Sequence, residues 1–475
     1  MARQNVRKTA PKAHESQLTH GGIRAASISA EQELRRSVMS CLLWEREFYE
    51  NGEDIATRIY NLAQKVAPTT VADIAIEARE NGKLRHAPLM LLSGLAKRGA
   101  GSPLVAATIG RVIQRADELG EFLAVHAKAN GVPLRAQNNS LSPGFKHVLS
   151  AQIKKGIALA FQKFDEYQLA KYDRDGEVRL RDALFLSHAK PKDEAQAALW
   201  KRLIEKELLI PDTWETNLSS GADKRETFER LIEEGKLGYL ALLRNLRNMV
   251  QAGCDQNLVR KAILARKGAH RVLPFRYVAA ARIVPQFEPE LDQALIASIR
   301  EMAPLPGKTV VLVDVSGSMD MVLSDKSDLR RIDAAAALAA IIPGMKRVFT
   351  FSNRVVEVPP RSGMAGIDAV IKSQSHGGTD FRAGMATVNQ LNRGASAYDR
   401  LIAITDEQTQ TQPEKSNATH SYVINVGSYQ RGIGYGGNTV HIDGFSESVI
   451  RFIGEHEGLP ANDNEEFDIE MDAVA

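Results

Sequence analysis

The strongest constraint on the fold is a change in the apolar pattern of the chain near Pro285. From about Ser29 to Val284, apolar residues recur at the spacing of amphipathic helices, and patterns typical of strands are scarce. Two of these apolar stripes are long, spanning Phe145–Tyr172 and Thr227–Gln251. Many successive helices of roughly 10–20 residues predict an α-solenoid of stacked helix pairs. No clean sequence period is present, so we expect the repeats to be degenerate.

After Pro285, predicted strands alternate with predicted helices. Thr309–Asp314 is a continuous apolar, β-branched run, which is typical of a strand buried in a parallel sheet. The pattern that follows predicts helices at 329–342, 364–373, 381–391 and 446–455, and strands at 346–352, 355–358, 400–405, 421–426 and 439–442. This alternation predicts a doubly wound α/β domain. We therefore divide the chain into a helical domain at 29–285 and an α/β domain at 286–460.

The two ends of the chain carry opposite charge. Residues 1–28 hold five basic residues and one acid, and we expect them to form a flexible basic arm. Residues 461–475 carry six acids and no base, and we expect this acidic tail to be disordered.

Composition narrows the class of protein. The chain has only two cysteines, Cys41 and Cys254, which excludes a disulfide scaffold and a cysteine-cluster zinc site and fits a reducing cytosol. The longest apolar run, Ala334–Ile342, is far short of the ~20 residues that span a bilayer. The basic N-terminus is not followed by the apolar stretch of a secretory signal. We expect a cytoplasmic protein without a membrane partner.

A set of oxygen donors follows the predicted strands of the α/β domain. Asp314, Ser316 and Ser318 come directly after the first strand, Thr379 lies in a Gly-Gly-Thr-Asp loop, and Asp406 ends the strand at 400–405. In an open α/β sheet, ligands bind outside the carboxyl ends of the strands, so these side chains can converge. Carboxylate and hydroxyl oxygens are hard donors, which suit a divalent cation such as Mg²⁺, or Mn²⁺, rather than zinc.

These five residues resemble the metal-ion-dependent adhesion site (MIDAS) of von Willebrand factor A domains. That site combines a DxSxS loop, a threonine on a second loop and an aspartate at the end of a later strand, and the resemblance covers about Pro306–Leu459. It implies a bound divalent cation with an open position that an anionic oxygen of a partner completes. Two alternatives remain open: the residues only cap turns, or the fold is kept without a bound metal.

The predicted α/β domain lacks the marks of a hydrolase. His376 is the only obvious candidate base near the oxygen donors, and no nucleophile is paired with it in the sequence. A structural histidine in a loop explains it as well. We therefore predict a binding site and no enzymatic activity.

Basic charge is concentrated in the helical part of the chain. The whole chain has a formal net charge of +3, whereas the segment 240–285 holds nine basic residues against one acid, a local charge of +8. Asparagine and aromatic residues interleave with these bases, as on surfaces that bind single-stranded nucleic acid. The candidate RNA-binding residues in this segment are Arg244, Asn245, Arg247, Arg271 and Arg276. The alternative is a solvated helix face that acids such as Glu229, Glu233 and Glu234 balance.

Together these features resemble the TROVE-module proteins of the Ro autoantigen family and its bacterial orthologues. The resemblance covers about Glu31–Ile453. It is carried by Ala170-Lys-Tyr172, Leu186-Ser-His188, Thr213-Trp214, Leu240-Ala-Leu-Leu-Arg-Asn-Leu246, Leu273-Pro-Phe275 and the DVSGSM, GGTD and TDE segments.

The resemblance implies a fold and a set of partners. It implies a closed ring of HEAT-like repeats whose ends an A domain joins, and a monomer that binds small noncoding Y-like RNA on its outer surface. Single-stranded ends of misfolded or structured RNA would enter the central hole. The family's Y-RNA contacts correspond here to Lys171, Arg174 and His188. In bacterial members a Y RNA links the ring to the exoribonuclease polynucleotide phosphorylase, for RNA degradation or ribosomal RNA maturation.

The leading hypothesis is therefore an RNA-binding ring scaffold or chaperone that serves RNA quality control. The alternative is a metal-dependent protein-interaction module whose A domain captures an acidic partner. A metal-dependent hydrolase is a third class, and no visible catalytic pair supports it.

Overall fold

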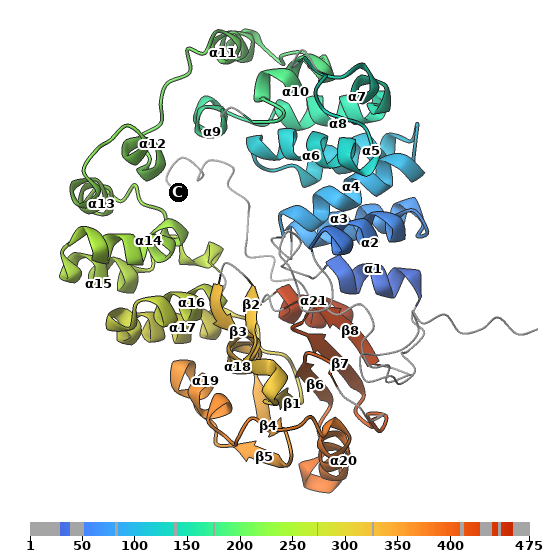
Figure 1. Ribbon diagram of the computed structural model, residues 1–475, viewed down its shortest axis with the longest axis vertical. Coiled ribbons are helices and arrows are strands. Elements are labelled where there is room, and N and C mark those ends of the chain that lie inside the picture. The colour runs from blue at the N-terminus through green and yellow to red at the C-terminus, as the bar shows by residue number, and fades with distance from the viewer. Residues whose placement is uncertain are drawn as a thin grey trace, which may run out of the picture.

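The computed structural model describes residues 29–38, 52–80, 84–136, 140–173, 176–272, 274–324, 327–408, 413–427, 439–444 and 448–458 (Figure 1). The predicted basic arm and acidic tail lie outside these residues, as does Arg174. No helix of the described residues is long and apolar enough to cross a membrane.

The described residues up to Glu301 are organised mainly in helices. The helices of the first helical block are α1 (Ala30–Val38), α2 (Gly52–Ala63), α3 (Pro68–Glu80), α4 (His86–Arg98), α5 (Pro103–Val112), α6 (Ala116–Ala129), α7 (Pro143–Val148), α8 (Ala151–Phe161), α9 (Glu166–Tyr172), α10 (Leu180–Ser187) and α11 (Glu194–Glu205). Those of the second helical block are α12 (Trp214–Ser219), α13 (Lys224–Glu233), α14 (Tyr239–Ala252), α15 (Gln256–Ala265), α16 (Phe275–Ile283) and α17 (Glu288–Glu301). Because α17 packs against α15 and α16, the helical block continues past the boundary predicted at 285.

Local capping explains where many of these helices begin. Ser150 and Asp165 accept hydrogen bonds from the first turns of α8 and α9, which divides the stripe at 145–172 into α7, α8 and α9. Gly235, at a φ of 66°, ends the turn after α13, and α14 begins after Gly238. The apolar stripes at 145–172 and 227–251 therefore each span more than one helix, because caps and glycines interrupt helices that share a similar spacing.

The helices form a closed circuit that the α/β domain completes (Figure 1). Each helix packs against helices near it in the chain, as α3 does on α4 and on α5. Helix α5 also packs on α8, where Gly156 allows close approach because a Cβ there would lie 2.6 Å from Ile109 Cβ. The first helix, α1, packs against the last strand of the α/β domain, while α16 and α17 pack against its helices α18 and α19. The predicted solenoid ring, joined at both ends by an α/β domain, is confirmed.

The α/β domain is built on one six-stranded sheet with the order β5-β4-β1-β6-β7-β8. The strands are β1 (Lys308–Asp314), β4 (Met345–Phe351), β5 (Val355–Val358), β6 (Arg400–Thr405), β7 (His420–Asn425) and β8 (Thr439–Asp443). All neighbours are parallel except β4 and β5, and Val311 at the centre pairs with Val348 of β4 and Ile402 of β6. A separate hairpin of β2 (Val322–Ser324) and β3 (Ser327–Arg330) follows β1.

Helices cover both faces of this sheet, as the doubly wound prediction requires. The helices are α18 (Arg331–Ile341), α19 (Gly363–Ile371), α20 (Phe381–Leu391) and α21 (Ser448–His456). Phe381 and Met385 of α20 pack with Leu312 on one face, whereas α18, α19 and α21 contribute to the core on the other face.

The buried apolar residues show how the ring is divided. One core runs from Leu34 to Trp200 and Leu203 and holds the first helical block together. A second runs from Phe228 to Ile453, so that the second helical block and one face of the sheet share one continuous core. The second block and the α/β domain therefore share one core, and the first block has its own.

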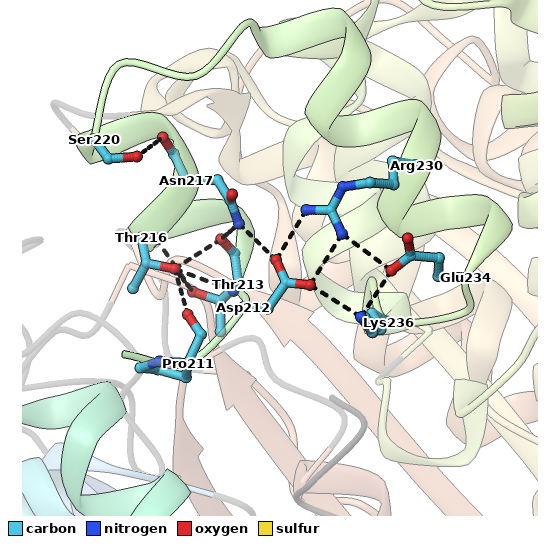
Figure 2. Close-up of polar contacts among 9 residues, drawn as sticks. All are labelled: Pro211, Asp212, Thr213, Thr216, Asn217, Ser220, Arg230, Glu234 and Lys236. Atoms are coloured by element: carbon cyan, nitrogen blue, oxygen red, sulfur yellow. Dashed lines mark hydrogen bonds and ion pairs between the residues drawn. The ribbon is translucent and has the colours of Figure 1, made fainter. Parts of the chain in front are cut away.

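The segment between α11 and α12 joins the two blocks through polar contacts. Figure 2 shows Asp212, just before α12, bonded to Arg230 of α13 at 2.9 Å and to Lys236 at 3.0 Å. On the other side, Glu166 of α9 accepts hydrogen bonds from Arg202 and from the backbone of Leu209. Leu209 is 74% exposed, so apolar burial contributes little at this joint.

Candidate metal centre and nucleic-acid surface

The first loop of the candidate metal centre leaves the central strand β1. Asp314 is fully buried, and its two carboxylate oxygens accept hydrogen bonds from the backbone of Ser316 at 2.8 Å and the hydroxyl of Thr405 at 2.7 Å. The hydroxyls of Ser316 and Ser318 lie 3.2 Å apart. The Asp-x-Ser-x-Ser spacing therefore brings three oxygen donors together at the carboxyl end of β1.

Asp406 approaches the same point from the neighbouring strand. Strand β6 pairs with β1 in parallel, so Asp406 emerges beside Asp314, and both are fully buried. Burial raises the pKa of Asp314, and the nearby charge of Asp406 raises it further. Burial also raises the pKa of Asp406, while the charge of Arg331 and the hydroxyl of Ser318 act in the opposite direction and lower it. Two buried carboxylates that disfavour each other's charge are an environment that attracts a cation.

The loop that carries Thr379 is held against the first loop by its backbone. The amide of Gly317 donates to the carbonyl of Gly377 at 2.9 Å, and the amide of Gly377 donates to Ser352 Oγ at 2.8 Å. A Cβ at position 377 would lie 2.2 Å from Asn353 Nδ2, so a side chain there would displace the amide of Asn353. Thr379 is half-buried and follows this clamped turn directly, before Asp380 caps α20.

The residues present fit a hard divalent cation. The donors on these loops are two carboxylates and three hydroxyls, all oxygen. Among the described residues, no group of three or more His, Cys, Asp and Glu side chains is placed to hold a metal ion, so a site of the zinc type is absent from this part of the chain. Asp314, Ser316, Ser318, Thr379 and Asp406 are the candidate ligands.

Two neighbours of this site, Arg331 and Thr405, were not identified from the sequence pattern, and a third, His376, was. Arg331 places a guanidinium nitrogen 3.1 Å from Asp406, and Thr405 binds Asp314. His376, the candidate base, contacts Asp320 through Nδ1 at 2.8 Å and the carbonyl of Ile371 through Nε2 at 2.9 Å. Both of its ring nitrogens are engaged in positioning the loop.

Several bases of the segment 240–285 are paired with acids in the fold. Arg260 pairs with Glu290, Arg266 with Glu301, and Arg282 with Asp368. The balancing acids come from α17 and α19, not from Glu229, Glu233 or Glu234, the acids that the sequence suggested as an alternative. The charge of +8 counted along the sequence therefore overstates the exposed positive charge.

Two arginines of α14 remain exposed on one side of the helix. Arg244 and Arg247 are separated by one helical turn, and Arg276 of α16 is exposed as well. Asn245 is 3% exposed, and its amide donates to the carbonyl of Ala241 at 2.9 Å, so its prediction as an RNA contact is wrong in this structure. It lies on the core face with Leu242 and Leu246. The side chain of Arg271 is outside the described residues.

The predicted outer RNA contacts lie on the first helical block. Lys171 lies in the last turn of α9, and its ammonium is 5.6 Å and 5.7 Å from the ring centres of Tyr167 and Tyr172. His188 is exposed and follows α10 at a φ of 52°, in a left-handed backbone conformation. Arg174 lies outside the described residues.

Comparison with known proteins adds an independent line of evidence. Residues 201–302 match the TROVE domain family, a range that contains α12–α17 and ends with α17. Over 107 residues, 22% of this chain, the sequence is 31% identical to telomerase protein component 1 of Mus musculus and 30% identical to that of Rattus norvegicus. The chain spans about 4% of the length of these curated relatives.

The fold as a whole is similar to that of a solved bacterial protein. The crystal structure of the Deinococcus radiodurans Ro (Rsr) protein superposes with a TM-score of 0.62 and 18% sequence identity. The match covers 90% of this chain and all of the other chain. At this identity the comparison establishes the shared fold.

Proposed function

We propose that this chain, which carries a TROVE domain and has the fold of a Ro protein, is an RNA-binding ring scaffold without a catalytic centre of its own. The observation that carries the proposal is the pair of exposed arginines on α14, Arg244 and Arg247, inside the TROVE match. Exposed arginines can contact RNA phosphates, and such contacts bind RNA with little regard to sequence.

The closed circuit of helices supports a selective role for this binding. A base-paired helix is wider than a single strand, so a ring admits RNA through free single-stranded ends. We propose that misfolded or structured RNAs with such ends bind inside the ring, and that a Y-like RNA binds the outer surface near Lys171, Arg174 and His188. The bound RNA would be presented to an exoribonuclease of the polynucleotide phosphorylase type in cytoplasmic RNA quality control or ribosomal RNA maturation, with the ring acting as a monomer.

We further propose that the metal centre holds Mg²⁺, or Mn²⁺, between Asp314, Ser316, Ser318, Thr379 and Asp406. A cation bound there supplies positive charge to an anionic oxygen of a partner. The chain's own residues position the ligands: Thr405 orients Asp314 and the Gly377 turn places Thr379. This site is the observation that supports a second candidate function, the capture of an acidic protein partner.

Charge reversal on α14 tests the RNA-binding proposal. We expect the double variant Arg244→Glu/Arg247→Glu to weaken binding of a short fluorescent single-stranded RNA at least tenfold, measured by anisotropy at moderate salt. The matched control is Lys201→Glu/Lys372→Glu, which changes the net charge equally at side chains that are 72% and 75% exposed and lie elsewhere. Equal affinity of both double variants would contradict the proposal.

The alternative function is tested at the metal centre. The variant Asp314→Ala removes a central ligand and is expected to leave RNA binding intact. If it abolishes the main association of the protein in cells while RNA binding persists, protein capture is the better description.

A further inference from the structure

The candidate metal centre contains a cation supplied by the protein itself, the guanidinium of Arg331. We propose that Arg331 is a built-in counterion that competes with the divalent cation for Asp406 and so lowers the metal affinity of the site. The inference rests on the metal centre proposed above and adds the residue that regulates its occupancy.

Arg331 is buried at the start of a helix and contacts Asp406 of the site. It is the first residue of α18, its backbone amide donates to the carbonyl of Met321 at 2.9 Å, and its side chain is 2% exposed. It is among the largest fully buried side chains of the described residues. A buried arginine is rare unless it is paired, because its guanidinium carries a charge.

Its partner is one of the proposed metal ligands. Arg331 Nη1 lies 3.1 Å from Asp406 Oδ2, while Asp406 Oδ1 accepts the backbone amide of Gln408 at 3.3 Å. The carboxylate is fully buried, so the ion pair is shielded from solvent and from screening by salt. A divalent cation that used this carboxylate would have to share it with the guanidinium or displace it.

The absence of a side chain at Gly427 leaves room for the guanidinium of Arg331. Gly427 follows the neighbouring strand β7 and closes the site on that side. A Cβ at Gly427 would lie 3.2 Å from Asp406 Cβ and 3.6 Å from Arg331 Cζ. The end of β7 therefore packs directly against the ion pair and holds Arg331 against Asp406.

The charge balance gives the direction of the effect. Asp314 and Asp406 together carry two negative charges, and Arg331 offsets one of them. A divalent cation therefore meets a site of formal charge −1 instead of −2. A unit charge within several ångströms in a buried site changes the affinity for a divalent cation by a factor of about ten or more.

Metal titration of full-length variants tests the proposal. Free Mn²⁺ is measured by electron paramagnetic resonance after the protein has been stripped with chelator. We expect Arg331→Met to bind Mn²⁺ at least about tenfold more tightly than the wild type, and Arg331→Lys, which keeps the charge, to bind as weakly as the wild type. Arg331→Gln, which keeps a hydrogen-bond donor, is a second neutral variant that should behave like Arg331→Met.

Thermal unfolding provides a second readout of the same competition. Without metal, Asp406 lacks its counterion in Arg331→Met, so this variant should melt below the wild type and gain more from added Mn²⁺. The matched control is Arg400→Met. Arg400 is 1% exposed and pairs with Glu457 at the opposite end of β6, so its loss should lower the melting temperature without changing Mn²⁺ affinity.

The possible outcomes separate this inference from the metal centre itself. Equal Mn²⁺ affinity in the wild type and both neutral variants, or weaker binding in the variants, would overturn the role of Arg331. Weaker Mn²⁺ binding in the variants would indicate that Arg331 contacts the anionic oxygen of the partner instead of competing with the metal. No Mn²⁺ binding in any variant, including those without Arg331, would overturn the metal centre and the inference together, while leaving the RNA-binding proposal untouched.

Discussion

Replacing Glu118 by alanine is expected to destabilise the first helical block by about 3–5 kcal/mol. Glu118, in the first turn of α6, has a side chain that is 1% exposed, and Oε1 accepts a hydrogen bond from Arg79 Nη2 at 2.7 Å. Oε2 accepts the backbone amides of Gln114 at 2.9 Å and Arg115 at 3.1 Å. The substitution therefore removes three charge-assisted hydrogen bonds and leaves a buried arginine without its carboxylate.

The pKa shifts of Glu118 and Arg79 indicate whether desolvation or mutual attraction dominates this buried ion pair. Burial raises the pKa of Glu118 and lowers the pKa of Arg79, so desolvation opposes the charge of both groups more than their attraction favours it. Replacing both by apolar residues should then cost less than the two single changes combined. We expect a coupling free energy of about 1–3 kcal/mol from the cycle of Glu118→Ala, Arg79→Met and the double variant.

Hydrogen exchange read by mass spectrometry locates the effect and measures its size. Because the first block has its own core, peptides of α3 and α6 should exchange faster in Glu118→Ala, whereas peptides of β1 and α18 should not change. The control is Glu80→Ala, which breaks a pair with Arg111 whose side chain is 58% exposed, and should cost no more than about 1 kcal/mol. A loss below about 1 kcal/mol for Glu118→Ala, or faster exchange throughout the α/β domain, would refute this reasoning.

Three further predictions concern pH, the joint between the blocks and the sheet. Burial lowers the pKa of His126, whose ring contacts Ser93 and the carbonyl of Val148. The stability of the wild type should therefore fall as the pH drops below 6.5, because the unfolded chain then binds a proton that the folded chain does not. Urea denaturation should show a smaller loss in His126→Gln. Asp212→Asn removes the carboxylate that Arg230 and Lys236 share at the joint, and it should lower the melting temperature at low salt. The difference in melting temperature between variant and wild type should shrink near 1 M salt. A difference that does not depend on salt would contradict an electrostatic cause. Arg400→Met leaves the buried carboxylate of Glu457 with the hydroxyl of Tyr422 but without its arginine at the start of β6. It should cost about 3–5 kcal/mol in chemical denaturation, more than Arg347→Met at an exposed pair between β4 and β5.

The α/β domain was largely predictable because its elements are short and sharply bounded. The helix at 381–391 and the strands at 355–358 and 400–405 have the predicted bounds, since apolar or β-branched runs end there at polar residues or at glycine and proline. The β2–β3 hairpin was missed because residues 322–330 contain neither alternation nor a turn signal of the Asn-Gly kind.

The candidate metal centre was predicted from spacing, while its electrostatics were not. Asp314 and Asp406 are 92 positions apart in the chain and meet because β1 and β6 are neighbours, which the alternation of strands and helices implies. Arg331 stands next to Arg330 in the sequence, yet one side chain is buried under the site and the other is 40% exposed. Only the path of the chain from the hairpin into α18 distinguishes them.

The basic segment shows the limit of counting charges along a sequence. Arg260, Arg266 and Arg282 find their acids on α17 and α19, which lie later in the chain than the counted segment. Asn245 falls on the buried side of α14 because that face also holds Leu242 and Leu246. Exposure of Arg244 and Arg247 follows from the same periodicity and was predictable.

The central claim, that exposed arginines of the ring bind single-stranded RNA through its phosphates, is tested most directly by salt dependence. Affinity for a short single-stranded RNA is measured across a salt titration for the wild type and for the neutral double variant Arg244→Gln/Arg247→Gln. The logarithm of the wild-type affinity should fall linearly with the logarithm of salt concentration, and the variant's slope should be shallower by about 1.4, for two lost phosphate contacts. An affinity independent of salt, or equal slopes for the two proteins, would contradict the account.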